Sequence, residues 1–163
     1  MDLDEAFEAY VDDLYRYLFS LSKNHHTTED LVQETFYRAY LQLSEDEISH
    51  IKPWLFKVAY HVFIDFIRKQ KRLVITDDVH KRMSMQTPEM DLLEKEGFTE
   101  LMNDIHSLKE IEMHALVLCD LHQLNLKEAA EILQLNLNTL KSHLSRGRKK
   151  VVERVKERRW QDG

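Results

Sequence analysis

The residues near the carboxyl end of the chain have the types and spacing needed to contact double-stranded DNA. No acidic residue occurs between Asn138 and Val152, although the chain as a whole carries a net charge of −6. Cationic and short hydrogen-bonding side chains recur along this run: Asn138, Thr139, Lys141, Ser142, Ser145, Arg146, Arg148 and Lys149. Arg and Lys read guanine in the major groove, and Ser reaches base edges or phosphate oxygens. The run therefore predicts a surface that enters a major groove.

A second set mixes basic and aromatic residues and follows Pro53. Its members are Trp54, Lys57, Tyr60, His61, Arg68, Lys69 and Arg72. Cations that follow phosphates and rings that stack on unpaired bases are typical of single-stranded DNA surfaces. A base held out of the stack also needs a pocket, which the loop 44–52 is expected to help build. The alternative is that Trp54 and Tyr60 only complete a core. Asp65 is expected to orient Arg68 or Lys69, because a carboxylate repels phosphate.

A third set predicts a protein-docking surface on a helix over 29–43. Val32, Phe36, Ala39 and Leu43 fall on one side of that helix and are expected to pack inward. The opposite side carries acids together with apolar groups: Asp30, Gln33, Glu34, Tyr37 and Leu41. A mixed stripe of this kind suits a protein partner, and its acids would favour a basic one. The alternative is a solvated face with incidental apolar residues.

Charge is unevenly distributed along the chain. Residues 1–65 carry 5 basic residues (Lys or Arg) and 13 acidic ones (Asp or Glu), and residues 66–72 carry 4 basic and no acidic residues. Residues 73–137 carry 5 basic and 13 acidic residues, and residues 138–163 carry 9 basic and 3 acidic ones. The local balances are therefore −8, +4, −8 and +6. Two basic segments in an otherwise acidic chain indicate two separate contacts with phosphates. The acidic remainder disfavours a protein that binds nucleic acid non-specifically over its whole surface. Two solvated helix ends are the competing interpretation.

The sequence lacks the usual motifs of metal sites and of several enzyme classes. The nine His occur without an HExxH or CxxC frame, so no metal site is expected. No Gly-rich phosphate loop or nucleophile-elbow sequence is present, so neither an enzyme nor a cofactor is predicted. Cys119, the single cysteine, lies in an apolar stretch, where it is expected to pack, and it suits a reducing cytosol. The amino-terminal residues do not resemble a signal peptide, and no stretch approaches the roughly 20 apolar residues of a membrane span.

The elements that must position these residues are helices. Apolar periodicity predicts helices over 4–21, from Thr27 to about 43 and from Pro53 to about 72, with Thr27 and Asp30 read as a capping box. His25 and His26 are placed in the preceding loop. No period is sustained over 74–88, and further helices are expected over 89–105, 108–121, 126–134 and 137–157. We therefore predict an all-α chain of two small domains: a three-helix bundle (1–72), a flexible linker (73–88) and a four-helix domain (89–163).

The segment 126–150 has the pattern of a helix-turn-helix. Ala130 suits the crossing of its two helices, and Ala129, Leu133, Leu135 and Leu140 are expected to lock them. On the second helix, Leu140, Leu144, Gly147 and Val151 share a core face opposite the polar one. Gln134 stands where many such motifs have Gly, which leaves open whether the turn adopts a left-handed backbone. An ordinary amphipathic helix is the alternative.

Three stretches together resemble a known family. TEDLVQETFYRAY (28–40) resembles sigma-factor region 2.2, WLFKVAYHVFIDFIRKQKR (54–72) resembles regions 2.3–2.4, and LNLKEAAEILQLNLNTLKSHLSRGRKK (124–150) resembles region 4. They occur in the right order, and nothing between them resembles region 3 or, before them, region 1.1. This plan resembles group IV, the extracytoplasmic-function (ECF) sigma factors of the sigma-70 family.

The resemblance implies a role for each surface. Asp30, Gln33, Glu34 and Tyr37 would bind the clamp helices of the polymerase β′ subunit. The helix 54–72 and the loop before it would melt and read the −10 element. The polar face of 138–149 would read the −35 element, with Arg148 and Lys149 on phosphates. His61 replaces an Asn common in the family, which leaves the choice of −10 base open.

The same resemblance implies partners and a location. They are core RNA polymerase, including its β flap, promoter DNA and a membrane-anchored anti-sigma factor, and the chain would act in the cytoplasm. The linker would thread toward the RNA exit path. The alternative function is a helix-turn-helix regulator that binds duplex DNA without polymerase. That alternative explains 126–150 but gives the Asp30 and Trp54 surfaces no role.

Overall fold

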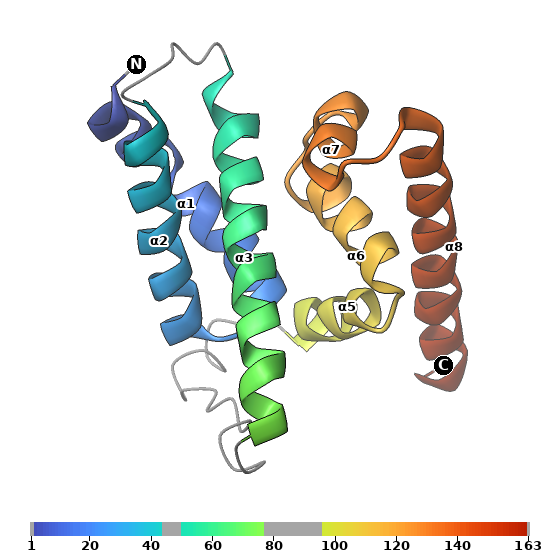
Figure 1. The fold of residues 1–163 in the computed structure, drawn as a ribbon. Helices are drawn as coiled ribbons and strands as arrows, with labels where there is room; N and C mark the ends of the chain where they lie inside the picture. The colour runs from blue at the N-terminus through green and yellow to red at the C-terminus, as the bar shows by residue number, and fades with distance from the viewer. Residues whose placement is uncertain (1, 44–49, 77–95, 163) are drawn as a thin grey trace. The chain divides into compact units, whose positions relative to one another are not determined.

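The computed structural model describes residues 2–43, 50–76 and 96–162, and throughout these ranges the ordered elements are helices (Figure 1). Backbone contacts divide the chain into two compact units, residues 1–91 and 92–163. The all-α, two-domain prediction is therefore confirmed. The predicted linker falls partly on residues 73–76, which are helical, and residues 77–88 lie outside the described ranges.

The first unit is built from three helices: α1 (Leu3–Ser22), α2 (His25–Leu43) and α3 (Ile51–Thr76). Their apolar stripes meet in a core where the buried Tyr17 ring stacks on Phe56, with ring centroids 4.8 Å apart. Leu14 and Leu18 from α1 and Leu55 from α3 are also fully buried there. Because each helix gives one apolar face to this core, its opposite face remains available to solvent and partners.

Helix α2 begins two residues before the predicted start. The side chain of Asn24 accepts a hydrogen bond from the backbone N–H of Thr27 at 2.9 Å, so Asn24, and not Thr27, caps the helix. His25 and His26 are consequently the first residues of α2, which corrects their placement in a loop.

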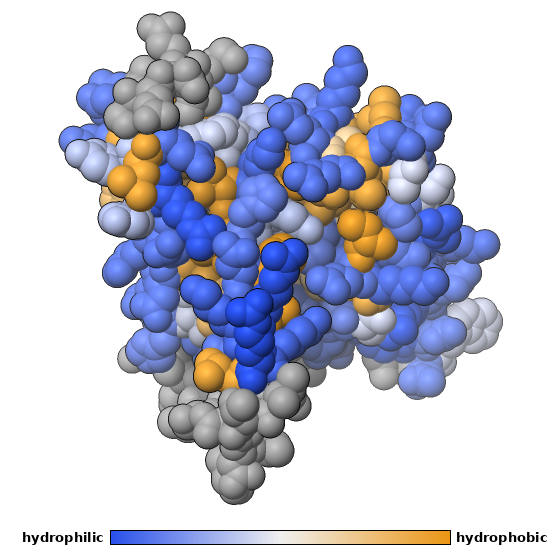
Figure 2. All heavy atoms as spheres, in the orientation of Figure 1, coloured by the Kyte–Doolittle hydropathy of each residue, from blue (hydrophilic) through white to orange (hydrophobic). Residues whose placement is uncertain are grey.

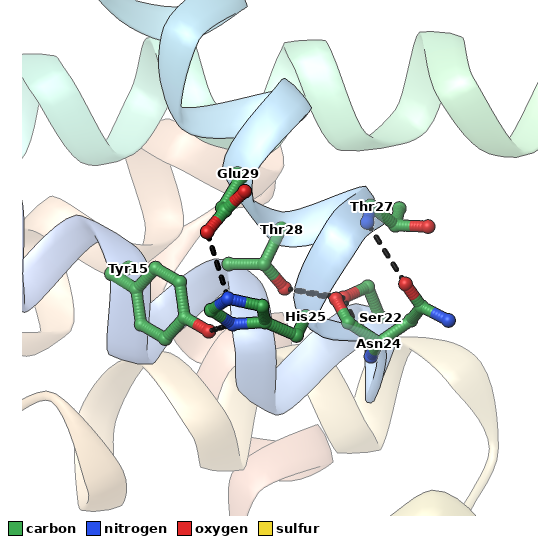
Figure 3. A network of polar contacts seen from close by, with 7 residues as sticks. All are labelled: Tyr15, Ser22, Asn24, His25, Thr27, Thr28 and Glu29. Carbon is green, nitrogen blue, oxygen red and sulfur yellow. Dashed lines mark hydrogen bonds and ion pairs between the residues drawn. The ribbon is translucent and has the colours of Figure 1, made fainter. Parts of the chain in front are cut away.

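Figure 3 shows how side chains secure this junction between α1 and α2. The His25 ring contacts the Tyr15 hydroxyl through Nδ1, and its Nε2 lies 2.7 Å from Glu29 Oε1. Ser22 and Thr28 share a hydrogen bond of 2.8 Å between their hydroxyls. The turn is thus tied to both helices, which fixes the direction in which α2 leaves α1.

Helix α3 has Pro53 in its first turn, as predicted, but it begins at Ile51, so residues 51 and 52 of the predicted loop are helical. It continues to Thr76 and not Arg72. Proline is tolerated in the first turn because the backbone N–H groups there have no helical acceptor. No Gly or Pro occurs after Pro53 until Pro88, so nothing in the residues after Arg72 interrupts the helix.

The second unit is built from shorter helices and one long one. α5 (Glu96–His106) and α6 (Glu110–Leu116) precede a π-helical turn, η2 (Val117–Leu121), and α7 (Leu126–Leu133) and α8 (Leu137–Asp162) complete it. The predicted helix over 108–121 therefore changes type at Val117. Of the helix predicted over 89–105, residues 89–95 lie outside the described ranges.

The turn between α7 and α8 settles the question left open at Gln134. Its φ of 55° and ψ of 46° lie in the left-handed region, so this Gln adopts the backbone that Gly would adopt most easily. The N–H of the next residue, Leu135, donates to the Ala130 carbonyl at 2.9 Å. Asn136 then accepts from the Thr139 N–H at 2.8 Å and caps α8. The two helices are therefore joined as a helix-turn-helix.

Candidate functional site

The polar face of α8 lies in solvent while its apolar face forms part of the core of the second unit. Leu140 and Leu144 are 0% and 2% exposed, Gly147 is buried and Val151 is half-buried. All but one of the predicted DNA-facing side chains are exposed, namely Asn138, Lys141, Ser142, Ser145, Arg146, Arg148 and Lys149, and Thr139 is half-buried. The two faces predicted for this helix are confirmed. The result is a cationic, donor-rich stripe on a firmly seated helix.

A buried carboxylate lies beneath this stripe. Glu112 of α6 is 1% exposed, and its Oε1 accepts a hydrogen bond from Lys150 Nζ at 2.7 Å. Its Oε2 lies 3.5 Å from Arg146 Nε. The hydrogen bond from Lys150 holds the pKa of Glu112 below its usual range, against the effect of burial. The carboxylate is therefore charged and anchors two cations of α8.

Arg148 is also engaged by an acid of the second unit. Its Nε and Nη2 donate to the two carboxylate oxygens of Asp120 at 2.9 and 2.7 Å, a bidentate pair. Glu112 and Asp120 were both absent from the sequence-based site. The signal for Glu112 was an acid inside the apolar run 111–118, since charged residues are rarely buried unless they are paired.

The face of α3 also separates into a buried seam and an accessible side. Leu55, Ala59 and Val62 are buried as predicted, and Phe66 is half-buried. The candidate DNA side chains divide by position: Trp54, Lys57, Tyr60 and His61 are half-buried, whereas Arg68, Lys69 and Arg72 are exposed. Strongly hydrophilic side chains, deep blue in Figure 2, lie over the carboxyl-terminal half of α3.

The aromatic end of α3 has its rings close together. The rings of Tyr60 and His61 lie 5.7 Å apart in an edge arrangement. Trp54 is half-buried. Its exposure therefore does not distinguish a ring that stacks on DNA from a ring that completes the core. Most of the loop expected to build a base pocket, residues 44–49, lies outside the described ranges.

Asp65 has a different partner from the one expected. Its Oδ2 accepts a hydrogen bond from Arg38 Nη1 of α2 at 2.9 Å, so it does not serve to orient Arg68 or Lys69. Arg38 Nε also donates to Glu34 at 3.0 Å. The expectation failed because it considered only neighbours on the same helix, whereas the actual cation lies on the adjacent one. Arg38 thus links the acidic face of α2 to α3.

The predicted docking face of α2 is exposed along its length. Asp30, Gln33 and Glu34 are exposed, and Tyr37 and Leu41 are 60% and 54% exposed. Tyr40 adds a further exposed ring at 64%. Val32, Phe36 and Ala39 are buried and Leu43 is half-buried, as expected for the inner side. Exposed aromatic and apolar side chains beside acids form a surface suited to a protein partner.

Other kinds of site receive no support from the described ranges. In residues 2–43, 50–76 and 96–162, no group of three His, Cys, Asp or Glu is arranged to hold a metal ion. Within the same ranges, no helix has the length and apolar character of a membrane span. Cys119 is half-buried, and burial, with the nearby charge of Asp120, raises the pKa of its thiol, which disfavours the nucleophilic thiolate.

Comparison with known proteins gives matches to both units. The family described as Sigma-70 region 2 matches residues 6–73, and the family described as Sigma-70, region 4 matches residues 99–151. The ECF RNA polymerase sigma factor SigM of Bacillus subtilis is 39% identical over 155 residues, which cover 93% of each chain. The RNA polymerase sigma factor SigV of the same organism is 33% identical, covering 84% of this chain and 81% of that one.

A solved structure shows the same fold. The sigma factor RpoE from Bartonella quintana, in complex with the anti-sigma factor NepR, superposes with a TM-score of 0.78 at 24% identity. The match covers 94% of this chain and 96% of that one. Both matched regions, and relatives aligned over nearly the whole length, show that the chain belongs to the ECF RNA polymerase sigma factors of the sigma-70 family, which direct core RNA polymerase to specific promoters.

Proposed function

We propose that the chain binds core RNA polymerase through α2 and reads promoter DNA with two separate surfaces, one on α3 and one on α8. The observation that carries the proposal is the exposed polar face over residues 138–149 of α8, which carries no acid and whose opposite face is buried in the core of the second unit. Such a helix can enter a major groove without disturbing the packing that holds it. In this proposal the α8 face reads the −35 element as duplex.

The α3 surface would act on the −10 element after the strands separate. Trp54, Tyr60 and His61 supply rings for unpaired bases, and Arg68, Lys69 and Arg72 supply charge for the backbone. Half-burial of the rings supports this role, because a stacking platform needs one side fixed by packing and the other accessible. On α8, Arg148 and Lys149 would contact phosphates; Arg148 would then exchange or share its pairing with Asp120.

The α2 face would bind the clamp helices of the β′ subunit. Asp30, Gln33, Glu34 and Tyr37 offer acids and an aromatic ring on one exposed side of a helix. The β flap is the second contact that we propose on polymerase. The chain would then have no catalytic role of its own, because polymerase supplies the chemistry, and it would work in the cytoplasm, where polymerase and promoter DNA are found.

An anti-sigma factor is the proposed regulator. The similar RpoE structure was determined with the anti-sigma factor NepR, which supports an equivalent partner for this chain. We propose that this partner is anchored in the membrane.

Reconstituted transcription tests the proposal directly. Core RNA polymerase of Bacillus subtilis, mixed with the purified chain, is expected to open and transcribe promoters that neither component opens alone, as measured by sequencing transcripts from genomic DNA. The competing function, a regulator that binds duplex DNA without polymerase, would instead give a tight palindromic footprint with the purified chain alone and no polymerase-dependent transcripts.

A further inference from the structure

Glu112 has a position that its role in packing does not explain. It is 1% exposed in a helix that also buries Met113 and Leu116, and a lone carboxylate there would be strongly disfavoured. A Cβ added at Gly147 would lie 3.4 Å from the Glu112 carbonyl oxygen and 3.5 Å from its Cβ. These are ordinary van der Waals distances, so α8 packs directly against α6 at the residue that presents the carboxylate.

Both oxygens of that carboxylate face cations of α8. Lys150 lies 2.7 Å from Oε1 and Arg146 lies 3.5 Å from Oε2, and the two cations are one turn apart on the helix. Replacement of a buried ion pair by apolar groups is often neutral for stability, so net stabilisation is a weak explanation of its presence. Fixing the geometry of the participating groups is the stronger one.

Arg146 is held from a second direction as well. Its Nη2 lies 3.0 Å from His143 Nδ1, one turn earlier on the same helix. The guanidinium has five N–H donors, so contacts at Nε and Nη2 still leave donors for a DNA base. The side chain remains 55% exposed. It is therefore oriented by its neighbours while it stays accessible from outside.

We propose that Glu112 is a positioning residue that orients Arg146 for base recognition in the −35 element. The inference rests on the proposed function of α8. A side chain already held in its binding geometry loses less freedom when it meets DNA, which favours the matching base over others. Glu112 itself would not touch DNA, because it is buried and carries the same sign of charge as phosphate.

The proposal predicts opposite behaviour for specificity and for general affinity. Glu112→Gln removes a negative charge from beneath a cationic helix, so affinity for arbitrary duplex DNA should stay the same or rise. The preference for the favoured −35 base should fall by about threefold or more, because Arg146 is no longer oriented. A merely structural defect would lower both quantities together.

The experiment uses the complete chain with core RNA polymerase of Bacillus subtilis. Transcripts from a promoter library randomised over the −35 element give base preferences, and binding to a duplex of unrelated sequence gives general affinity. The variants are Glu112→Gln, Arg146→Ala and the two combined. Glu110→Gln is the matched control, since it makes the same charge change on α6 at a carboxylate that is 68% exposed.

The double variant separates positioning from folding. If Glu112 acts through Arg146, Glu112→Gln weakens base preference in the parent chain and has no further effect beside Arg146→Ala. An undiminished effect in the Arg146→Ala background, or an unchanged preference in the single variant, overturns the inference. Should circular dichroism show that Glu112→Gln is unfolded, the same readings are taken on Glu112→Met, because Arg146 and Lys150 are exposed enough to turn toward solvent.

Failure of the inference and failure of the proposed function give different results. If Arg146→Ala changes no −35 base preference, the assignment of α8 as the −35 reader is wrong. If Arg146→Ala changes that preference while Glu112→Gln does not, the reader is correctly assigned and only the positioning role of Glu112 is rejected.

Discussion

Gln134 adopts a backbone conformation that residues with a Cβ seldom occupy. The left-handed geometry is required there because the N–H groups of Gln134 and Leu135 both reach open carbonyls at the end of α7. A residue with a Cβ is strained in this region by roughly 1 kcal/mol, whereas Gly is not. The turn of the DNA-binding motif is therefore formed at some cost in stability.

Gln134→Gly should stabilise the second unit by roughly 0.5–1 kcal/mol because it relieves this strain. Gln134→Val should destabilise it, since a β-branched residue is disfavoured further at positive φ. Urea denaturation followed by circular dichroism measures both changes. A loss of stability in the glycine variant would show that contacts of the Gln side chain outweigh the strain of its backbone.

His114 makes the second unit sensitive to acid. Burial, with a smaller effect of the nearby His106, lowers the pKa of this ring to about 4 from its ordinary 6.5. The folded unit thus holds the neutral ring, while the unfolded chain takes up a proton near pH 6.5. The neutral His114 ring therefore makes its full contribution to the free energy of unfolding above pH 6.5. This contribution is lost as the pH falls from 6.5 to about 4.

Between pH 7.5 and pH 5, this linkage should remove about 2 kcal/mol from the free energy of unfolding of the second unit. Hydrogen exchange across α6, corrected for intrinsic rates, gives that free energy at each pH. His114→Leu should lose much less over the same interval, whereas a change at the exposed His26 should behave like the parent chain. Equal losses in the parent and His114→Leu would assign the acid sensitivity to other groups.

At the scale of elements, helix α2 presents its acids on one side and buries its apolar groups on the other. Asp30→Lys reverses one charge on the exposed side without touching the core of the first unit. Its affinity for core RNA polymerase should fall by about tenfold or more, since like charges facing each other at an interface are strongly unfavourable. Glu8→Lys makes the same charge change on the exposed side of α1 and is the control. Fluorescence anisotropy of the labelled chain measures both, and equal affinities would place the docking surface elsewhere.

Trp54 at the start of α3 distinguishes stacking from packing. If the half-buried ring stacks on unpaired DNA, Trp54→Ala should reduce open-complex formation by about fivefold or more, given the roughly 1–3 kcal/mol that a base–aromatic stack contributes. Binding to closed duplex promoter should change little. Permanganate footprinting and thermal unfolding measure the two possibilities, and a large fall in melting temperature with normal promoter opening would identify the ring as a core residue.

The elements were largely predictable because their apolar residues recur with helical periods. Leu140, Leu144 and Gly147 identified the buried side of α8, and the polar side followed from it. Ends were less predictable: Asn24 and Thr27 are both acceptable caps in sequence, and only the actual hydrogen bond distinguishes them. The onset of η2 at Val117 has no breaker residue to signal it.

Contacts between helices were beyond the reach of sequence periodicity. Arg38 and Asp65 are 27 positions apart, and Glu112 and Lys150 are 38 apart, so no spacing rule could have paired them. Periodicity thus predicted which side of each helix is accessible, but it missed the acids that pair with the cations on those sides. Packing between helices decides which acid pairs with which cation, and the spacing of residues along the sequence does not contain that information.

For the whole molecule, the division into two compact units predicts that damage to one core stays local. Leu140→Ala removes a fully buried side chain from the second unit and should cost about 2–5 kcal/mol there. Hydrogen exchange should accelerate throughout α6 and α8 and remain unchanged in α1 and α2. A matching acceleration in α1 and α2 would mean that the chain unfolds as one cooperative body.

The acids that hold α8 also bear on how promoter choice can be inherited or engineered. A recognition helix transplanted alone from a relative would bring new residues to positions 146 and 150 but would leave Glu112 behind. An apolar or acidic residue at position 146 or 150 would remove a cation that pairs with the buried carboxylate. An Arg at position 146 without an acid at position 112 would have no partner beneath it to orient its side chain. If α8 reads the −35 element as proposed, positions 112, 146 and 150 should be exchanged together, and a swap of promoter preference should succeed when α6 is transferred with α8.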